Sequence, residues 1–272
     1  MEDIIDLFKS NIGKFNMIDE LDDGLNNKIY LINDLFIWKV FKNKNLFDSE
    51  TEKYIMNQLD QYEVYYNDEN NICYKYFNGN NIDRVYFKSN LDKVMSLAGK
   101  FNSYKLDIKN FWYDIIPKWL NILLDEELDV IYQEICLELT EISSQDDIVL
   151  CHHDIHSGNI IKNRNKLVLI DLECSFNNYF FVEIGNIICE VYTDYDNENY
   201  NYEEINEDVI KSVQYLYDYK IATLEQIKMG IKISHFYWCV WGFLLDKNND
   251  NSDFDYKNFA LIRKKFINFV VN

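Results

Sequence analysis

The densest group of chemically reactive side chains lies in residues 151–161, which read CHHDIHSGNII and hold three of the four histidines of the chain. A structural zinc site would need about four cysteine or histidine ligands that converge tetrahedrally. His152 and His153 are adjacent, so they would point to opposite sides of an extended segment. No second cluster of cysteines and histidines follows, and His235 is the one histidine left. The segment therefore does not favour zinc.

An aspartate and an asparagine in the same segment fit a different chemistry. Asp154 and Asn159 are five residues apart, and Asp171 follows the apolar run 167–170, twelve residues after Asn159. This spacing is typical of the catalytic and metal-binding segments of kinases. There the first aspartate orients the attacking hydroxyl and accepts its proton, while the other two residues supply the oxygen ligands that Mg²⁺ prefers beside the phosphates of ATP. We expect Asp154 to carry the chemistry and His152 to hydrogen-bond within the loop.

Short strands around one helix are predicted for the first part of the chain. Apolar, β-branched and aromatic residues predict strands at 28–34, 35–41, 62–66 and 71–77, and helical spacing predicts an amphipathic helix at 49–59. Asn33 and Asp34 suit the turn of a hairpin between the first two strands.

A polar connector at residues 78–81 marks the expected boundary between an N-terminal lobe, residues 1–78, and a C-terminal lobe, residues 79–272. Helical patterns continue to about residue 145, and residues 148–172 predict a strand, a loop and two further strands. The rest is predicted to be helical apart from a polar, acidic loop at 193–208. We therefore predict an α+β, bilobal, protein-kinase-like fold, with a small antiparallel sheet in the first lobe and a larger, mainly helical second lobe.

Composition narrows the partners. The 272 residues carry a net charge of −19, which disfavours binding to nucleic acid or to an anionic membrane surface. Hydrophobic residues make up 48% of the chain, enough for a substantial core. The six cysteines are scattered without a CxxC pair, and neither a signal peptide nor an apolar run of about 18 residues is present. We expect reduced thiols and a cytoplasmic location.

Two long stretches resemble the choline/ethanolamine kinase family. Residues 151–161 are similar to the family's CHNDxxxGNIL loop, and residues 167–195 to its IDFEYxxYNYxxFDIGNHFCEWxxDY segment. Residues 235–263 resemble its C-terminal helix-loop-helix, which has two tryptophans three residues apart. The similarity is fainter but collinear elsewhere, and the combined motifs are far more specific than the Asp/Asn loop, which antibiotic phosphotransferases share.

The resemblance implies roles for residues in the catalytic and nucleotide sites. Asp154 matches the catalytic base, and Asn159, Asp171 and Glu173 match residues at or near the magnesium ions. For the nucleotide, the resemblance implies Lys39 at the ATP phosphates with Glu52, or its rival Glu50, as helix partner, Asn27 in a GxxNxxY loop, and Tyr76 in the adenine-contacting connector 73–79.

A substrate pocket is expected on both physical and family grounds. A quaternary ammonium donates no hydrogen bonds, so proteins bind it with aromatic faces and a nearby carboxylate. The family positions expected to line such a pocket are Glu183, Glu190, Tyr195, Trp238, Trp241 and Phe259, with Glu173 also near the substrate. A Trp-x-x-Trp pair on a helix is otherwise more often core packing.

Several positions depart from the family pattern. Phe259 stands where a tyrosine is expected, Val191 replaces a tryptophan, and His153 and His156 replace an asparagine and a glutamine-like residue. These changes bear on substrate preference more than on catalysis. Cys189 slightly favours choline, because ethanolamine kinases tend to have asparagine there.

The expected function is ATP- and Mg²⁺-dependent phosphorylation of the hydroxyl of a small amino alcohol, with choline the leading substrate and phosphocholine the product. Ethanolamine kinase, an aminoglycoside-type phosphotransferase and a non-catalytic choline-binding module remain alternatives. The expected setting is phospholipid and phosphatidylcholine biosynthesis in the cytoplasm. We expect no nucleic-acid partner and no stable membrane association, and a homodimer is left open.

Overall fold

A computed structural model describes residues 1–21, 27–42, 48–195, 197, 199–248 and 254–268. The chain divides into two compact units. The first, here called the sheet unit, contains Met1–Asn80 and Ile161–Cys174, and the second, the helical unit, contains Asn81–Ile160 and Ser175–Asn272. The division at residue 80 lies close to the expected connector, but the return of 161–174 to the first unit has no counterpart in the predicted boundary.

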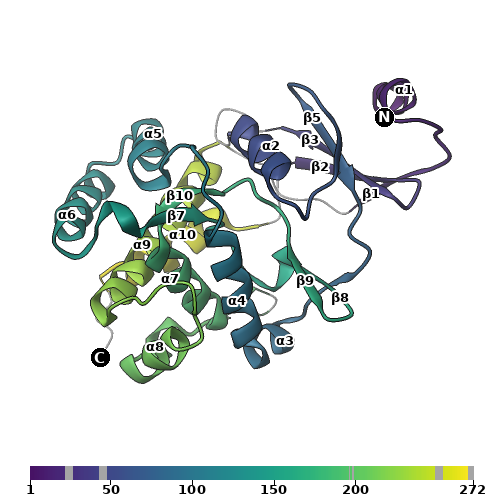
Figure 1. Ribbon diagram of the computed structural model, residues 1–272. Coiled ribbons are helices and arrows are strands. Elements are labelled where there is room, and N and C mark those ends of the chain that lie inside the picture. The colour runs from purple at the N-terminus through teal and green to yellow at the C-terminus, as the bar shows by residue number, and fades with distance from the viewer. Residues whose placement is uncertain (22–26, 43–47, 196, 198, 249–253, 269–272) are drawn as a thin grey trace. The chain divides into compact units, whose positions relative to one another are not determined.

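The sheet unit is built on five antiparallel strands (Figure 1). In chain order they are β1 (Ile18–Leu21), β2 (Asn27–Ile32), β3 (Phe36–Phe41), β4 (Val64–Asn67) and β5 (Asn71–Lys75), and their order in the sheet is β1-β2-β3-β5-β4. The predicted hairpin is confirmed, because β2 pairs with β3 and Asn33 and Asp34 both have positive φ, 55° and 56°. Polar residues with short side chains tolerate this left-handed conformation.

An N-terminal helix and a short first strand were not predicted. Helix α1 (Glu2–Asn11) places Ile4 and Phe8 in a core cluster that includes Ile32 and Trp38 of the sheet. A helix of ten residues is marginally stable on its own, so α1 depends on these contacts with the sheet.

Helix α2 (Ser49–Gln58) lies beside the sheet and carries one of the predicted site residues (Figure 1). Asp48 caps it by accepting a hydrogen bond from the Thr51 backbone N–H at 3.2 Å. Its buried residues include Glu52, Ile55 and Met56, which matches the predicted amphipathic helix. The helix therefore turns Glu52 inward.

Strands β8 (Ile160–Asn163) and β9 (Lys166–Leu169) are neighbours in a separate sheet that also contains β6 (Asn80–Asn81). The carbonyl oxygen of Leu169, at the end of β9, accepts a hydrogen bond from the Tyr62 hydroxyl at 2.8 Å. This bond fixes the segment that leads to Asp171 within the sheet unit.

The helical unit contains eight α-helices among its described residues. They are α3 (Arg84–Ser89), α4 (Leu91–Asn102), α5 (Ile116–Leu123), α6 (Glu126–Ile142), α7 (Phe180–Val191), α8 (Glu207–Gln214), α9 (Leu224–Lys247) and α10 (Tyr256–Phe266). A π-helical turn, Phe111–Ile115, leads into α5, and β7 (Ile148–Cys151) pairs antiparallel with β10 (Phe176–Tyr179). The predicted loop at 193–208 holds the small strands β11 (Thr193–Asp194) and β12 (Asn199–Tyr200), a 3₁₀ turn, and the start of α8.

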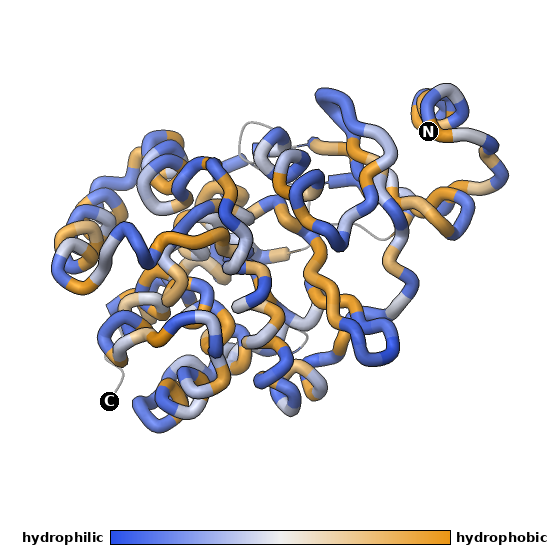
Figure 2. The backbone as a smooth tube through the Cα atoms, in the orientation of Figure 1, coloured by the Kyte–Doolittle hydropathy of each residue, from blue (hydrophilic) through white to orange (hydrophobic). Residues whose placement is uncertain are grey.

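Helix α9 is buried on nearly every side, since α5, α6, α7, α8 and α10 all contact it. It meets α7 at a pair of glycines: a Cβ on Gly185 would lie 2.2 Å from the carbonyl carbon of Gly230, so no larger residue fits there. By contrast, α6 shows both hydrophilic and hydrophobic faces, as expected for a helix at the surface (Figure 2). Within the described part of the chain, no helix is both long enough and apolar enough to span a membrane.

Candidate active site

In the sheet unit, Lys39 of β3 is the centre of a buried charged group. Its Nζ lies 2.7 Å from Glu52 Oε1 and 2.9 Å from Asp171 Oδ1, and the side chains of Lys39 and Glu52 are each 3% exposed. Burial alone would lower the pKa of Lys39, but the carboxylates of Asp171 and Glu52 hold it well above its ordinary value. Lys39 is therefore a fixed cation, and Glu52 is its helix partner; Glu50 pairs with Lys53.

Asn27 and Glu173 also meet within this unit. The Asn27 side chain donates a hydrogen bond to Glu173 Oε2 at 2.7 Å. This contact brings the end of the predicted nucleotide loop to the acidic residue two positions after Asp171. The rest of that loop, residues 22–26, lies outside the described residues. Tyr76 follows β5 and donates its backbone N–H to the Leu35 carbonyl at 2.8 Å.

In the helical unit, Asp154 and Asn159 form one hydrogen-bonded pair. Asn159 Nδ2 donates to the Asp154 backbone oxygen at 3.0 Å and to its Oδ2 at 2.7 Å. The amide nitrogen therefore holds the aspartate in place, and the amide oxygen is the atom of Asn159 that can bind a metal. Asp171, the third residue of the predicted catalytic set, belongs to the sheet unit.

Glu183, on the first turn of α7, holds the backbone that precedes Asp154. Its side chain is fully buried, and its two oxygens accept the backbone N–H groups of His152 at 2.5 Å and His153 at 3.0 Å. Burial raises the pKa of Glu183 to about 7, against the lowering effect of these hydrogen bonds. Glu183 therefore holds the backbone of the predicted catalytic loop, residues 151–161, and its contact with substrate stays a prediction.

His153 has a strained backbone conformation with a φ of 66°. Several contacts hold it there: its Nε2 lies 2.9 Å from Asn178 Nδ2, its ring packs on Phe111 with centroids 4.2 Å apart, and its carbonyl accepts the Tyr237 hydroxyl. The strained residue directly precedes Asp154, so these contacts fix the position of the Asp154 backbone.

The other two histidines of the segment bond to the loop backbone. His152 Nδ1 accepts the Asp154 N–H at 3.3 Å, and His156 Nδ1 accepts the Gly158 N–H at 3.1 Å. His152 thus makes the kind of loop contact that the sequence predicted. Among the residues that the structure describes, no three His, Cys, Asp or Glu side chains are grouped to hold a metal ion. A Mg²⁺ that draws most of its ligands from water and nucleotide phosphates needs no such group.

Glu190, near the end of α7, is the centre of a second buried ion pair. Its Oε1 lies 2.9 Å from Arg263 of α10, and both side chains are at most 2% exposed. The Tyr195 hydroxyl donates to the same carboxylate, 3.0 Å from Oε2. Arg263 in turn stacks on the rings of Tyr202 and Phe259, 5.0 and 5.2 Å from their centroids.

Trp238, Trp241 and Phe259 form one aromatic cluster behind this pair. The two tryptophan rings are 5.1 Å apart, and Phe259 lies 6.3 and 5.9 Å from them. Trp238 Nε1 donates to Asn186 Oδ1 at 3.0 Å, whereas Trp241 Nε1 has no hydrogen-bond partner among the described residues. The structure thus brings the three predicted rings together.

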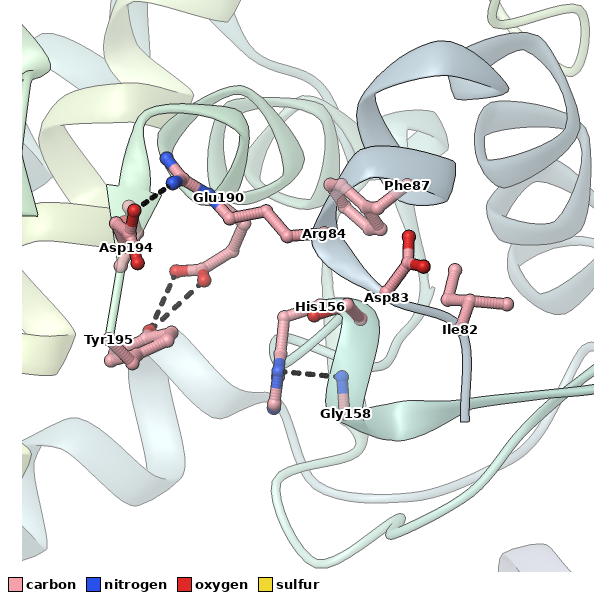
Figure 3. Close-up of a pocket in the computed structure, with 11 residues that line it drawn as sticks. Ile82, Asp83, Arg84, Phe87, His156, Gly158, Glu190, Asp194 and Tyr195 are labelled. Atoms are coloured by element: carbon pink, nitrogen blue, oxygen red, sulfur yellow. Dashed lines mark hydrogen bonds and ion pairs between the residues drawn. The ribbon is translucent and has the colours of Figure 1, made fainter. Parts of the chain in front are cut away.

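A cavity of about 270 Å³ opens beside the catalytic loop (Figure 3). Glu190 and Tyr195 line it, together with His156, whose Nε2 lies 3.8 Å from Asp154 Oδ2. In Figure 3 the Glu190 carboxylate faces the Tyr195 hydroxyl, and the His156 ring lies against Gly158. Trp238, Trp241 and Phe259 are not among its lining residues, so the predicted substrate residues divide into a cavity group and a packed aromatic group.

Sequence reasoning missed several residues of this site. Arg263 is the buried partner of Glu190, and Asp83, Arg84 and Phe87 of the α3 segment line the cavity with Asp194. Arg263 could have been suspected, because it lies four residues after Phe259 on the same face of a predicted helix. We find no sequence signal that would have singled out Arg84.

Comparison with known proteins identifies the family and the fold of the chain. A family model described as choline/ethanolamine kinase matches residues 21–268. A probable choline kinase 2 of Arabidopsis thaliana is 30% identical over 156 residues, which cover 51% of this chain and 44% of that protein. The chain thus spans less than half the length of this relative.

Two solved structures show the same fold at low sequence identity. An ethanolamine kinase from Plasmodium vivax has a TM-score of 0.77 at 18% identity, covering 93% of this chain and 82% of that one. The choline kinase LicA from Streptococcus pneumoniae also has a TM-score of 0.77 at 18% identity, covering 98% of both chains. The predicted α+β kinase-like fold is confirmed, and the chain belongs to the choline/ethanolamine kinase family.

Proposed function

We propose that this protein transfers the γ-phosphate of ATP to the hydroxyl of a small amino alcohol, with choline as the preferred substrate. One observation carries the proposal. The cavity that holds a carboxylate and an aromatic ring suited to an ammonium group, Glu190 and Tyr195, also holds His156, 3.8 Å from the Asp154 carboxylate. A cationic head group at Glu190 would thus direct its hydroxyl toward Asp154.

Each polar group has a defined part in this reaction. Asp154 orients the hydroxyl and accepts its proton as the bond to phosphorus forms, while the Asn159 amide keeps the carboxylate in place. Lys39, kept charged by its two carboxylate neighbours, binds the phosphates and offsets their negative charge. Because the transition state is loose, most of the rate enhancement comes from positioning and charge neutralisation.

Magnesium fits the donor set. Asn159, Asp171 and Glu173 offer amide and carboxylate oxygens, the hard ligands that Mg²⁺ prefers, and we propose them as its protein ligands. When bound, the ion would neutralise charge on the ATP phosphates. Asn27 and Tyr76 are proposed nucleotide contacts, Asn27 because it bonds to Glu173.

The size of the cavity favours a small substrate over an aminoglycoside. Pockets for drug-sized ligands span roughly 300–1,000 Å³, whereas this one measures about 270 Å³. Tyr195 and Phe87 give it aromatic faces suited to a methylated ammonium. Cys189, by contrast, lies in the core with its Sγ 3.6 Å from His235 Nε2, so its slight indication of choline rests on family resemblance alone. A cytoplasmic role in making phosphocholine for phospholipid synthesis belongs to the same proposal.

A substrate panel tests the assignment. The kcat/KM of the purified protein is measured with ATP and Mg²⁺ for choline, ethanolamine and an aminoglycoside, by coupling ADP release to NADH oxidation. We expect turnover of both amino alcohols, with choline preferred, and none of the aminoglycoside. Preference for ethanolamine would reject the choline assignment, and turnover of the aminoglycoside alone would reject the amino-alcohol class.

A further inference from the structure

The cavity beside the catalytic loop has a second wall to which no role has been given. Asp83, Arg84 and Phe87, in and just before α3, line it together with His156, Ser157 and Gly158. In Figure 3 the Arg84 side chain extends from α3 past Glu190 to Asp194. Arg84 and Asp194 form an ion pair in which the side chains are 31% and 17% exposed. The positively charged Arg84 therefore lines a cavity whose proposed substrate is also a cation.

The charges around the cavity show why Asp194 matters. Three acidic residues line it, Asp83, Glu190 and Asp194, against one basic residue, Arg84. Glu190 is already paired with the buried Arg263. Asp194 is the ion-pair partner of Arg84, whose Nε has no hydrogen-bond partner among the described residues. Without the Asp194 charge, the balance of charge around the cavity would shift by one unit toward positive, which would disfavour a cation.

We propose that the Arg84–Asp194 ion pair is a specificity determinant of this cavity. Arg84 closes the wall between α3 and β11, and Asp194 neutralises it so that a cationic head group is attracted and not repelled. Both residues act on substrate affinity and not on phosphoryl transfer. This inference rests on the proposed function for the nature of the substrate, but it concerns binding, which can be measured without turnover.

Asn197 supports the same geometry from the other side. Its side chain donates to Asp194 Oδ2 at 3.2 Å, so the carboxylate is held toward Arg84 by a neutral donor. The pair is only partly exposed, so solvent screens its charges less than those of a surface pair. Removing one charge of the pair should therefore change the affinity of the cavity for a cationic ligand.

Calorimetric binding of choline and of its uncharged isostere 3,3-dimethyl-1-butanol tests the proposal. Asp194→Asn should weaken choline binding about tenfold, because it leaves Arg84 as an uncompensated cation a few ångströms away. The uncharged alcohol should change by less than about twofold. Arg84→Met combined with Asp194→Asn should recover most of the lost choline affinity. Lys211→Met, which breaks the exposed Lys211–Glu207 pair, serves as the control for a change of surface charge.

The outcomes separate the two proposals. Equal weakening of both ligands in Asp194→Asn, no effect on choline, or failure of the double variant to recover would overturn the role of the ion pair. If circular dichroism shows that Asp194→Asn does not fold, Arg84→Met is used in its place. This variant removes the cation and keeps Asp194, so choline binding should not weaken relative to the alcohol, and such weakening would overturn the proposal. Choline that binds the wild type without being phosphorylated would reject the proposed function and leave the ion pair testable.

Discussion

Replacement of Glu183 by glutamine should remove the pH dependence of stability that arises from the burial of this carboxyl group. Glu183 is fully buried against the backbone of the catalytic loop, and burial raises its pKa from an ordinary 4.5 to about 7. The folded protein therefore binds this proton more tightly than the unfolded chain does. The resulting stabilisation is fully present below about pH 4.5 and is lost as the pH rises through about 7.

The size of the effect follows from the two pKa values. The interval from 4.5 to about 7 corresponds to about 3 kcal/mol of unfolding free energy. Glutamine keeps the shape of the side chain but does not titrate. The free energy of unfolding of the wild type minus that of Glu183→Gln should therefore fall by about 3 kcal/mol between about pH 4.5 and about pH 8.

Urea denaturation at a series of pH values measures this difference. Other groups titrate equally in both proteins, so they cancel. Glu203→Gln, at an exposed position of the same unit, is the matched control and should show no such trend. A difference between wild type and Glu183→Gln that stays flat across this range would refute the inference that burial raises the pKa of Glu183.

Two further predictions concern the other charged and aromatic groups. Lys39→Met leaves Glu52 and Asp171 without their shared cation, so it should lower stability by about 3–5 kcal/mol and raise the KM for ATP. The exposed Lys75–Glu63 pair provides the control, since Lys75→Met should leave stability almost unchanged, and equal losses in the two variants would contradict the account. Trp241 packs against Trp238 and Phe259 and does not line the cavity, so Trp241→Ala tests the family-based prediction that it contacts the substrate: the choline KM should rise roughly three- to thirtyfold with little effect on the KM for ATP. A change in ATP affinity alone would place Trp241 outside substrate recognition.

The hairpin and the helix α2 of the sheet unit could be predicted from the sequence. Residues 28–34 and 35–41 are rich in apolar, β-branched and aromatic residues on either side of the turn at Asn33 and Asp34, and the structure pairs them as a hairpin. Helix α2 was predicted from the spacing of Ile55 and Met56, and it turns Glu52 to Lys39. These features depend on neighbours close in sequence, which is why patterns predict them.

Features that depend on distant parts of the chain were not predictable in this way. The segment 161–174 joins the sheet unit because residues such as Leu169 bond to Tyr62, more than a hundred positions away. The pairing of Arg263 with Glu190 likewise requires α7 and α10 to be placed by α9. Family resemblance predicted Glu183 as a substrate contact. Its hydrogen bonds to the backbone of His152 and His153 are visible only in the structure, because they join residues about thirty positions apart.

The central claim is that Asp154 promotes phosphoryl transfer to an amino alcohol. The most direct measurement is the rate of formation of the phosphorylated product from ATP and choline, followed by ³¹P NMR for the wild type and for Asp154→Asn. The account predicts phosphocholine from the wild type and a rate at least about a hundredfold lower from a folded Asp154→Asn variant. Near-normal product formation by that variant, or no phosphorylated amino alcohol from the wild type, would contradict it.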